Sequence, residues 1–204
     1  MQQLVASELT PRDVLDAATR VVKIYGAGGL GRIEAYQTGC LISPEGHVLT
    51  ANSLVLDGGQ VTVVTHTGDR YSAVVLGADP IAEVAVLKFD PAGESLGYFD
   101  LAAKPAVYSG QRAFALANVF GIASGDEPVS VQRCVVAAVA PLKARRGPLQ
   151  RIDGDDVLIL DAVTSNPGAA GGAVVDREGR LIGMLGRELT SRVTGTWLNY
   201  AAPV

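Results

Sequence analysis

Short apolar runs alternate with turn residues along most of the chain, from residue 39 to the C-terminus. Residues 41–43 and 48–50 flank a Pro-Glu-Gly turn, and residues 61–64 and 71–76 flank a Thr-Gly-Asp turn. Each pair predicts a β-hairpin, because runs rich in Val, Ile, Thr and Tyr between turn residues are typical of strands. Further strand-like runs follow at 84–89, 113–117, 129–139, 157–163, 173–176, 181–185 and 196–201. Many short strands at regular spacing predict an all-β protein built of antiparallel barrels.

The N-terminal 20 residues carry a different pattern. Residues 11–19 place Val14, Leu15 and Ala18 on one helical stripe. Thr10 suits the N-cap and Pro11 the first helical position, since proline lacks the amide hydrogen that would be unpaired there. The pattern therefore predicts one short helix before the first strand.

Residues 90–105 are richer in Gly, Pro and polar side chains than the segments around them, which indicates a connector. We therefore expect an N-terminal segment with the short helix (1–20), a first β-barrel lobe (21–95), a connector (96–106) and a second β-barrel lobe (107–204), together forming one domain. Residues 143–156 are charged and contain Gly and Pro, so we expect a solvated insertion there, with the basic cluster 143–146 at its start.

Composition narrows the functional classes. The chain has 204 residues, 48% of them hydrophobic, and a mean hydropathy of +0.26, which predicts a compact core. A net charge of −4 without a basic run excludes the electrostatic footprint of a nucleic-acid-binding protein. No apolar run is long enough for a membrane span, and no signal peptide is visible. Cys40 and Cys134 lie in apolar β-like runs, which predicts buried free thiols, although they could also pair.

Two glycine-rich stretches need separate explanations. Residues 26–31 match G-x-G-x-x-G after a strand, but too few residues follow for the crossover helix of a dinucleotide site. We therefore expect a hairpin loop there. Residues 166–172 read Asn-Pro-Gly-Ala-Ala-Gly-Gly between two strand-like runs. Glycine loses more entropy on folding than other residues, so this block predicts a tight loop whose N–H groups form an anion-binding nest.

The block at 166–172 resembles the nucleophile loop of trypsin-like serine proteases of the bacterial HtrA (Deg) type, Asn-Pro-Gly-Asn-Ser-Gly-Gly. In that family the serine attacks, and amides of the loop stabilise the oxyanion. Ala170 stands where the resemblance implies the serine. The resemblance extends from about residue 21 to 203 and implies a trypsin-like fold of two six-stranded antiparallel β-barrels.

Two further blocks resemble the regions of this family that carry the other catalytic residues. The sequence Leu-Thr-Ala-Asn-Ser at 49–53 resembles Leu-Thr-x-x-His, so Ser53 stands at the position of the general base. The block at 79–88 resembles Asp-Pro-x-x-Asp-(Ile/Leu)-Ala-Val-Leu-Lys, which places Glu83 where an aspartate orients that base. The last strand, 198–203, also resembles the family.

All three triad positions therefore differ from the family, and we expect no intact catalytic residue. Alanine has no nucleophilic atom, and a serine cannot act as a base near pH 7. Losses of this kind cost on the order of 10⁶ in rate in serine proteases. A hydrogen bond between Ser53 and Glu83 is expected to fill the space left by the triad.

The resemblance also implies where a peptide would bind. Gly168, Ala169 and Ala170 correspond to the oxyanion-hole loop, and Thr164 and Ser165 to the start of the specificity pocket. The segment 161–166 is one residue longer than is usual in the family, which implies a reshaped pocket. His47 and His66 lie beside turns, and we expect both to be exposed hairpin-tip residues. No cluster has metal-ligand spacing, and we expect neither a metal nor another cofactor.

Three functional hypotheses follow. The first is a catalytically inactive protease homologue that binds a peptide, a partner protein or its own flanking domains. The second is a hydrolase of the same family that carries engineered substitutions or a relocated nucleophile. The third is a ligand- or nucleotide-binding protein that uses residues 26–31 or the nest at 168–172. HtrA-type relatives often trimerise and work outside the cytoplasm, so the resemblance implies a homo-oligomer and an extracytoplasmic location, while the residues themselves leave both open.

Overall fold

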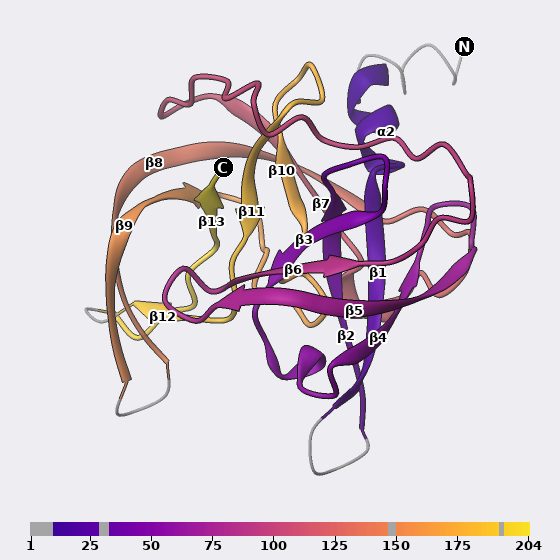
Figure 1. The fold of residues 1–204 in the computed structure, drawn as a ribbon. Coiled ribbons are helices and arrows are strands. Elements are labelled where there is room, and N and C mark those ends of the chain that lie inside the picture. Colours follow the sequence, from indigo (N-terminus) through magenta and orange to yellow (C-terminus); the bar gives the residue numbers. More distant parts are fainter. Residues whose placement is uncertain (1–9, 29–32, 147–149, 192–193) are drawn as a thin grey trace.

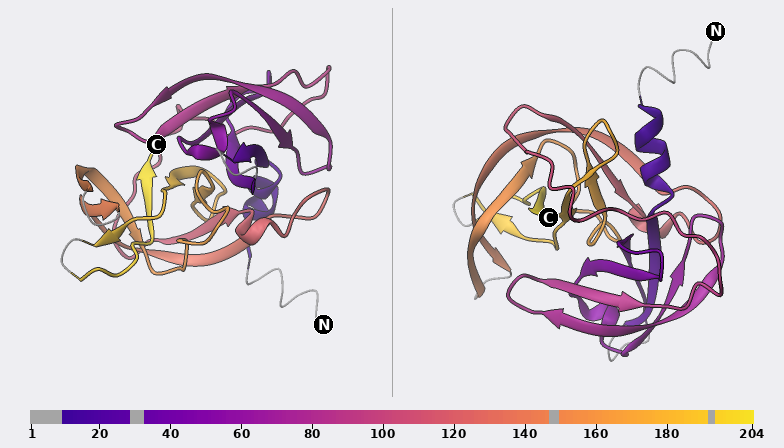
Figure 2. Two further views of the ribbon diagram at one scale, coloured as in Figure 1. Left: turned by 90° about the horizontal axis from the view of Figure 1, so that it is seen from below. Right: turned by 45° about the horizontal axis from the view of Figure 1, so that its top comes forward.

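The structure, a computed structural model, describes residues 10–28, 33–146, 150–191 and 194–204. Two β-barrels lie side by side, and the helix α2 (Arg12–Ala18) sits at one end of the boundary between them (Figure 1). The views in Figure 2 show the first barrel and the second as separate rings of strands. The prediction of an all-β, trypsin-like fold with one short N-terminal helix is confirmed.

Among the described residues, strands β1 to β6 form the first barrel, which is closed. Its strands follow the order β1-β2-β3-β6-β5-β4, and β4 pairs with β1 to complete the ring. The strands are β1 (Val21–Gly28), β2 (Ile33–Leu41), β3 (His47–Ala51), β4 (Gln60–Val64), β5 (Arg70–Asp79) and β6 (Val84–Lys88). A short 3₁₀-helix, η2 (Leu54–Leu56), follows β3.

The second barrel follows the order β8-β7-β10-β11-β13-β9 and closes where β8 pairs with β9. The strands are β7 (Arg112–Ala117), β8 (Ser130–Arg146), β9 (Gln150–Leu160), β10 (Ala173–Val175), β11 (Leu181–Leu185) and β13 (Tyr200–Pro203). The short β12 (Thr190–Ser191) adds to the outer end of β8. A 3₁₀-turn, η3 (Val119–Gly121), follows β7. The described residues hold no helix of the length and hydropathy that crossing a bilayer requires.

Three local expectations need correction. Pro11, not Thr10, occupies the N-cap of α2 and makes no side-chain cap bond; its carbonyl accepts from the amides of Val14 and Leu15. The predicted insertion at 143–156 instead continues β8 and β9 as one long hairpin, because the ladder resumes after an irregularity at Pro141. The predicted strand at 196–201 is reduced to the bridge at Trp197 and the start of β13.

The glycine-rich stretch begins inside β1, whose residues 26–28 pair with β2 in a hairpin arrangement. Strands β1 and β2 pair antiparallel in continuous register, with Gly28 opposite Ile33. Residues 29–32 lie outside the described residues. An antiparallel neighbour leaves no room for the crossover helix of a dinucleotide fold. Strand β1 therefore leads into an antiparallel strand rather than into the βαβ unit of a dinucleotide site, in agreement with the expected hairpin.

A shared core joins the two barrels. Side chains from α2, β1, β7 and β10 pack with Phe99 of the connector into one buried cluster, which includes Val14, Val21, Leu116 and Val175. Each barrel also has its own apolar interior. Both cysteines are buried free thiols, as predicted. The connector is therefore held in the structure by burial of Phe99.

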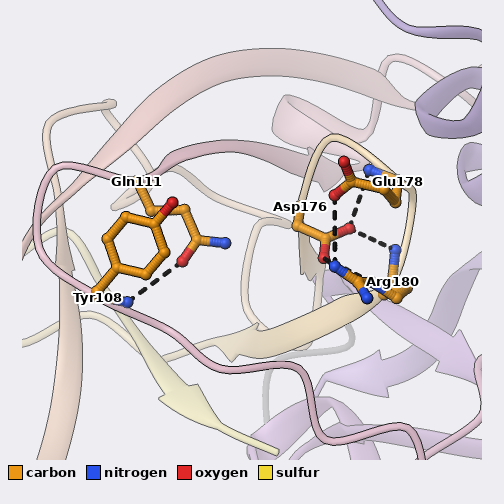
Figure 3. Close-up of polar contacts among 5 residues, drawn as sticks. All are labelled: Tyr108, Gln111, Asp176, Glu178 and Arg180. Atoms are coloured by element: carbon orange, nitrogen blue, oxygen red, sulfur yellow. Dashed lines mark hydrogen bonds and ion pairs between the residues drawn. The ribbon is translucent and has the colours of Figure 1, made fainter.

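The turn between β10 and β11 is organised by a buried carboxylate, Asp176 (Figure 3). Asp176 is 1% exposed and accepts from the amides of Glu178 and Arg180 at 3.1 and 2.9 Å. The Arg180 guanidinium adds two contacts to the same carboxylate at 2.8 and 2.7 Å. Gly179, at φ +72°, brings the turn against α2, since a Cβ there would lie 2.4 Å from the carbonyl oxygen of Asp13. Figure 3 also shows the turn just before β7, where the Tyr108 amide donates to Gln111 Oε1 at 3.2 Å.

Replacing Asp176→Ala should lower the free energy of unfolding by about 2 kcal/mol, because hydrogen bonds to a buried charge are worth about 1.5–3 kcal/mol. Urea denaturation followed by circular dichroism measures this change. Glu178→Ala, in the same turn but on an exposed side chain, is the matched control and should shift stability by less than about 0.5 kcal/mol. Equal effects of the two substitutions would contradict the role given to Asp176.

Candidate functional site

A cavity of about 280 Å³ lies between the two barrels. Five of the residues predicted for the site line it: Ser53, Thr164, Ser165, Gly168 and Ala170. Ala169 is buried beside them and does not line the cavity. Glu83 does not line it either, but its carboxylate lies 3.9 Å from the guanidinium of Arg187, which does.

The loop at 166–172 is a tight turn that requires its glycines. The Ala169 amide donates to the Asn166 carbonyl at 3.0 Å, and Gly168 has φ +85°. A Cβ on Gly168 would lie 2.3 Å from the carbonyl oxygen of Asn118, and one on Gly171 would lie 2.2 Å from that of Thr38. Any larger residue at either position would displace backbone, so the unusual composition of the block has a steric reason.

The carbonyl groups of this loop accept hydrogen bonds, whereas two of its amides have no acceptor among the described residues. The carbonyl of Gly168 accepts from Thr38 Oγ1 at 2.6 Å, and that of Ala170 accepts from the Thr38 amide at 3.0 Å. The Pro167 carbonyl accepts from the Phe120 amide at 2.7 Å. By contrast, the amides of Gly168 and Ala170 have no acceptor among the described residues. Two unpaired donors on one cavity wall can bind an anion or a carbonyl oxygen.

Side chains of the first barrel bind the loop at residues 123–125, in the second barrel. Three successive carbonyls, from Ala123 to Gly125, accept from the Tyr25 hydroxyl at 2.6 Å, from Arg70 at 2.7 Å and from Lys23 Nζ at 2.5 Å. Lys23 is 1% exposed, and its burial lowers the pKa of its ammonium group, with Glu127 and Asp126 opposing that shift. Sequence reasoning missed this contact, because Lys23 gave no signal beyond its place in a strand.

Ser53 has a structural role. Its hydroxyl donates to Gln37 Oε1 and accepts from the Val55 amide at 3.1 Å, which caps η2. The Gln37 amide group in turn donates to Thr50 Oγ1 at 2.8 Å and to the Ala51 carbonyl at 2.9 Å. The expected bond between Ser53 and Glu83 is therefore replaced by one to Gln37, a buried residue that sequence reasoning did not single out.

The predicted specificity-pocket residues, Thr164 and Ser165, are tied to the start of β13. Asn199 Oδ1 accepts from both of their amides, at 2.9 and 3.2 Å. The Ser165 hydroxyl donates to the Leu198 carbonyl at 2.7 Å. On the opposite side, Gly186 lies against the ring of Tyr200, since a Cβ on Gly186 would come within 2.1 Å of it. The pocket wall is therefore fixed by contacts behind it.

Other nucleophiles are poorly placed for chemistry in the cavity. Burial raises the pKa of both cysteine thiols, Cys40 and Cys134, to about 12, so neither is a thiolate near pH 7. Ser43 Oγ lies 2.7 Å from His47 Nδ1, but neither residue lines the cavity. His47 is half-buried rather than exposed as expected, because this contact folds it over the turn, whereas His66 is exposed. The described residues contain no group of side chains that could hold a metal ion.

The fold and the loop at 166–172 define a class of protein. Residues 37–184 match the family described as the trypsin-like peptidase domain. The match covers more than half of the chain, and the chain belongs to this family.

Similar proteins narrow the class to the HtrA type. A protein of Chlamydia pneumoniae, named probable periplasmic serine endoprotease DegP-like, is 33% identical over 147 residues, covering 72% of this chain and 28% of the relative. The putative serine protease HhoA of Synechocystis is 28% identical over 175 residues, covering 85% of this chain and 41% of the relative. The chain thus spans well under half the length of these relatives.

Two solved structures share the fold over nearly the whole chain. The protease domain of MamO from Magnetospirillum magneticum, in its apo form, has a TM-score of 0.70 and 25% identity, covering 92% of this chain and 93% of that one. The HtrA-type protease AlgW, solved with a tripeptide, has a TM-score of 0.71 and 27% identity, covering 94% and 58%. The HtrA-type resemblance predicted from the sequence is confirmed.

Replacing Ser53→Ala should lower the free energy of unfolding by about 1 kcal/mol, because η2 loses its cap. Chemical denaturation measures the change. Ser72→Ala, on the exposed face of β5, is the matched control and should change stability by less than about 0.5 kcal/mol. If Ser53→Ala leaves the stability unchanged, the structural role assigned to its hydroxyl is wrong.

Proposed function

We propose that this domain is a catalytically inactive trypsin-like protease homologue that binds an extended peptide segment in the cleft between its barrels. The observation that carries the proposal is the state of the nucleophile loop. It keeps two amides without acceptors among the described residues, at Gly168 and Ala170, while the side chain at the attacking position is a methyl group. Such a site can hold a peptide carbonyl oxygen but has no atom to attack the carbonyl carbon.

The absence of a base at the cleft supports the same proposal. Acyl transfer by this route needs a nucleophile within hydrogen-bond reach of a base that a third group orients. Ser53 uses its hydroxyl to cap η2 and to bond Gln37. Glu83 lies near a guanidinium, which stays protonated in proteins and so cannot serve as the base. Substrate binding without turnover is the function that these residues favour.

The segment after β11 offers a backbone edge for the peptide. The amides of Arg187 and Glu188, which line the cavity, have no acceptor among the described residues. An extended peptide can pair with such an edge by main-chain hydrogen bonds, which give affinity with little dependence on sequence. The proposed ligand is therefore a peptide or an unfolded segment of a partner protein.

The names of the relatives suggest a location and a kind of partner for this protein. Several are named periplasmic endoproteases, and one solved relative was captured with a tripeptide. We extend both points to this chain as part of the proposal: an extracytoplasmic location and a peptide or protein partner. Self-association stays a prediction of the resemblance.

A second candidate is a peptidase with a relocated nucleophile. The contact between Ser43 and His47, at 2.7 Å, is the observation that favours it, because a serine beside a histidine is the core of an activated nucleophile. Neither residue lines the cleft that carries the two amides, so this pair lacks the oxyanion stabilisation of the first site. We place it second for that reason.

The chain should not hydrolyse a fluorescently labelled, intrinsically unfolded casein above the buffer rate, but should bind it in a polarisation assay. The triple variant Ser53→His/Glu83→Asp/Ala170→Ser should recover measurable turnover if the cleft is in working order. Because Ser53 also caps η2, circular dichroism must show the variant folded before its rate is interpreted.

Turnover by the unmodified chain that disappears in Ser43→Ala would overturn the proposal in favour of the second candidate. Turnover that survives Ser43→Ala would also overturn it and would point to another nucleophile. Failure of the folded chain to bind casein would contradict the proposed peptide cleft.

A further inference from the structure

Arg187 lines the cleft close to the nucleophile loop. The Gly171 amide donates to the Leu185 carbonyl at 2.9 Å, and the Leu185 amide donates to the Gly172 carbonyl at 2.7 Å. These bonds hold the end of β11 beside the nucleophile loop, and Arg187 follows two residues later on the cavity wall. Its guanidinium reaches the opposite barrel, where Nη1 is 3.9 Å from Glu83 Oε1.

The cleft is therefore lined by a cation and a pair of amides, and a carboxylate outside its lining lies beside the cation. The carboxylate of Glu83 comes from the turn before β6, the cation of Arg187 follows β11, and the amides belong to Gly168 and Ala170. A histidine beside the carboxylate could act as a base, whereas an arginine there keeps its proton and remains a cationic donor, partly balanced by Glu83. A fixed cation and two inward donors together select an anion.

We propose that the cleft recognises the free C-terminal carboxylate of the bound peptide, with one oxygen at the amides of Gly168 and Ala170 and the charge neutralised by Arg187. This inference rests on the proposed function and names its ligand. A carboxylate differs from an internal peptide group by a second oxygen in place of nitrogen and by a full negative charge. Ala170 leaves room for that second oxygen, since the serine hydroxyl of an active loop would occupy the same side of the carbonyl carbon.

The ion pair between Glu83 and Arg187 is weak enough for Arg187 to bind an entering carboxylate. At 3.9 Å, with 26% of the Arg187 side chain and 21% of the Glu83 side chain exposed, it is a long and partly solvated ion pair. Pairs of this kind contribute little, whereas short hydrogen bonds between a guanidinium and a carboxylate are about twice as strong as neutral ones. An entering carboxylate can therefore gain the guanidinium while Glu83 keeps it oriented.

The preceding residues of such a peptide would follow the backbone edge at 187–188. This edge adjoins the wall formed by Thr164 and Ser165, which Asn199 holds in place. The last side chain of the peptide would then face a pocket with little freedom to widen. The same cleft would bind a peptide whose chain continues past the amides less tightly, because such a peptide brings no carboxylate to Arg187.

The test is a comparison of two peptide pools. N-terminally fluoresceinated hexapeptides of random sequence are made once as free acids and once as C-terminal amides, and polarisation measures their binding to the intact chain. We expect the acid pool to bind at least about 10-fold tighter, the effect of about 1.4 kcal/mol. Arg187→Gln should bring the ratio of the two affinities to about one, and Arg187→Lys should restore part of the preference.

Arg177→Gln, on the exposed turn between β10 and β11, is the matched control and should keep the full preference. Circular dichroism serves as the folding control for each variant. Equal affinity of the acid and amide pools would overturn the carboxylate inference and leave the proposed peptide cleft standing. Failure of both pools to bind the unmodified chain would overturn both proposals.

Discussion

The orientation of the nucleophile loop depends on Thr38, a fully buried residue of the first barrel. Its hydroxyl donates to the Gly168 carbonyl and accepts from the Asn118 amide at 2.9 Å, while its own amide donates to the Ala170 carbonyl. One residue of β2 thus holds two segments of the second barrel. The peptide units that carry the Gly168 and Ala170 amides are held by their own carbonyls: the Pro167 carbonyl accepts from the Phe120 amide and the Ala169 carbonyl from the Gly172 amide, at 2.7 and 3.0 Å. This arrangement does not involve the side chain at 170.

In the proposed function, loss of the nucleophile and retention of the oxyanion-type donors are therefore separable. The donors depend on backbone geometry, which is fixed by Gly168, Gly171 and Thr38. The chemistry of an active enzyme depends on side chains that can be exchanged without moving that backbone. The degenerate triad that we propose, on an ordered cradle, would suit binding, since preorganised donors lose little entropy when a ligand arrives.

Much of the fold was predictable because its signals are local. Hairpins such as the one around Pro44 follow from turn residues between β-branched runs. The glycines at 168 and 171 predicted a tight loop, and the structure shows that a Cβ at either position would clash with backbone. The long hairpin at 143–156 was mispredicted, because its charged composition resembles that of a solvated loop while its pairing depends on distant register.

The electrostatics of the site were far less predictable. Lys23 meets Gly125, which is 102 positions away in the chain, and Arg187 meets Glu83 across the two barrels. Neither contact leaves a pattern in the sequence, because each depends on how the barrels pack against each other. Gln37 was missed for a similar reason: a glutamine in a strand carries no sign that it will bond the hydroxyl at 53.

The central claim is that the amides of Gly168 and Ala170 remain a working binding cradle. The most direct measurement is the two-dimensional ¹H–¹⁵N spectrum of the chain during titration with a binding peptide. Amide protons that form a new hydrogen bond to a charged or carbonyl oxygen should move downfield, so the account predicts such shifts at both residues, saturating with the binding curve. Saturable peptide binding with both resonances unmoved would contradict the claim, because the ligand would then occupy another surface.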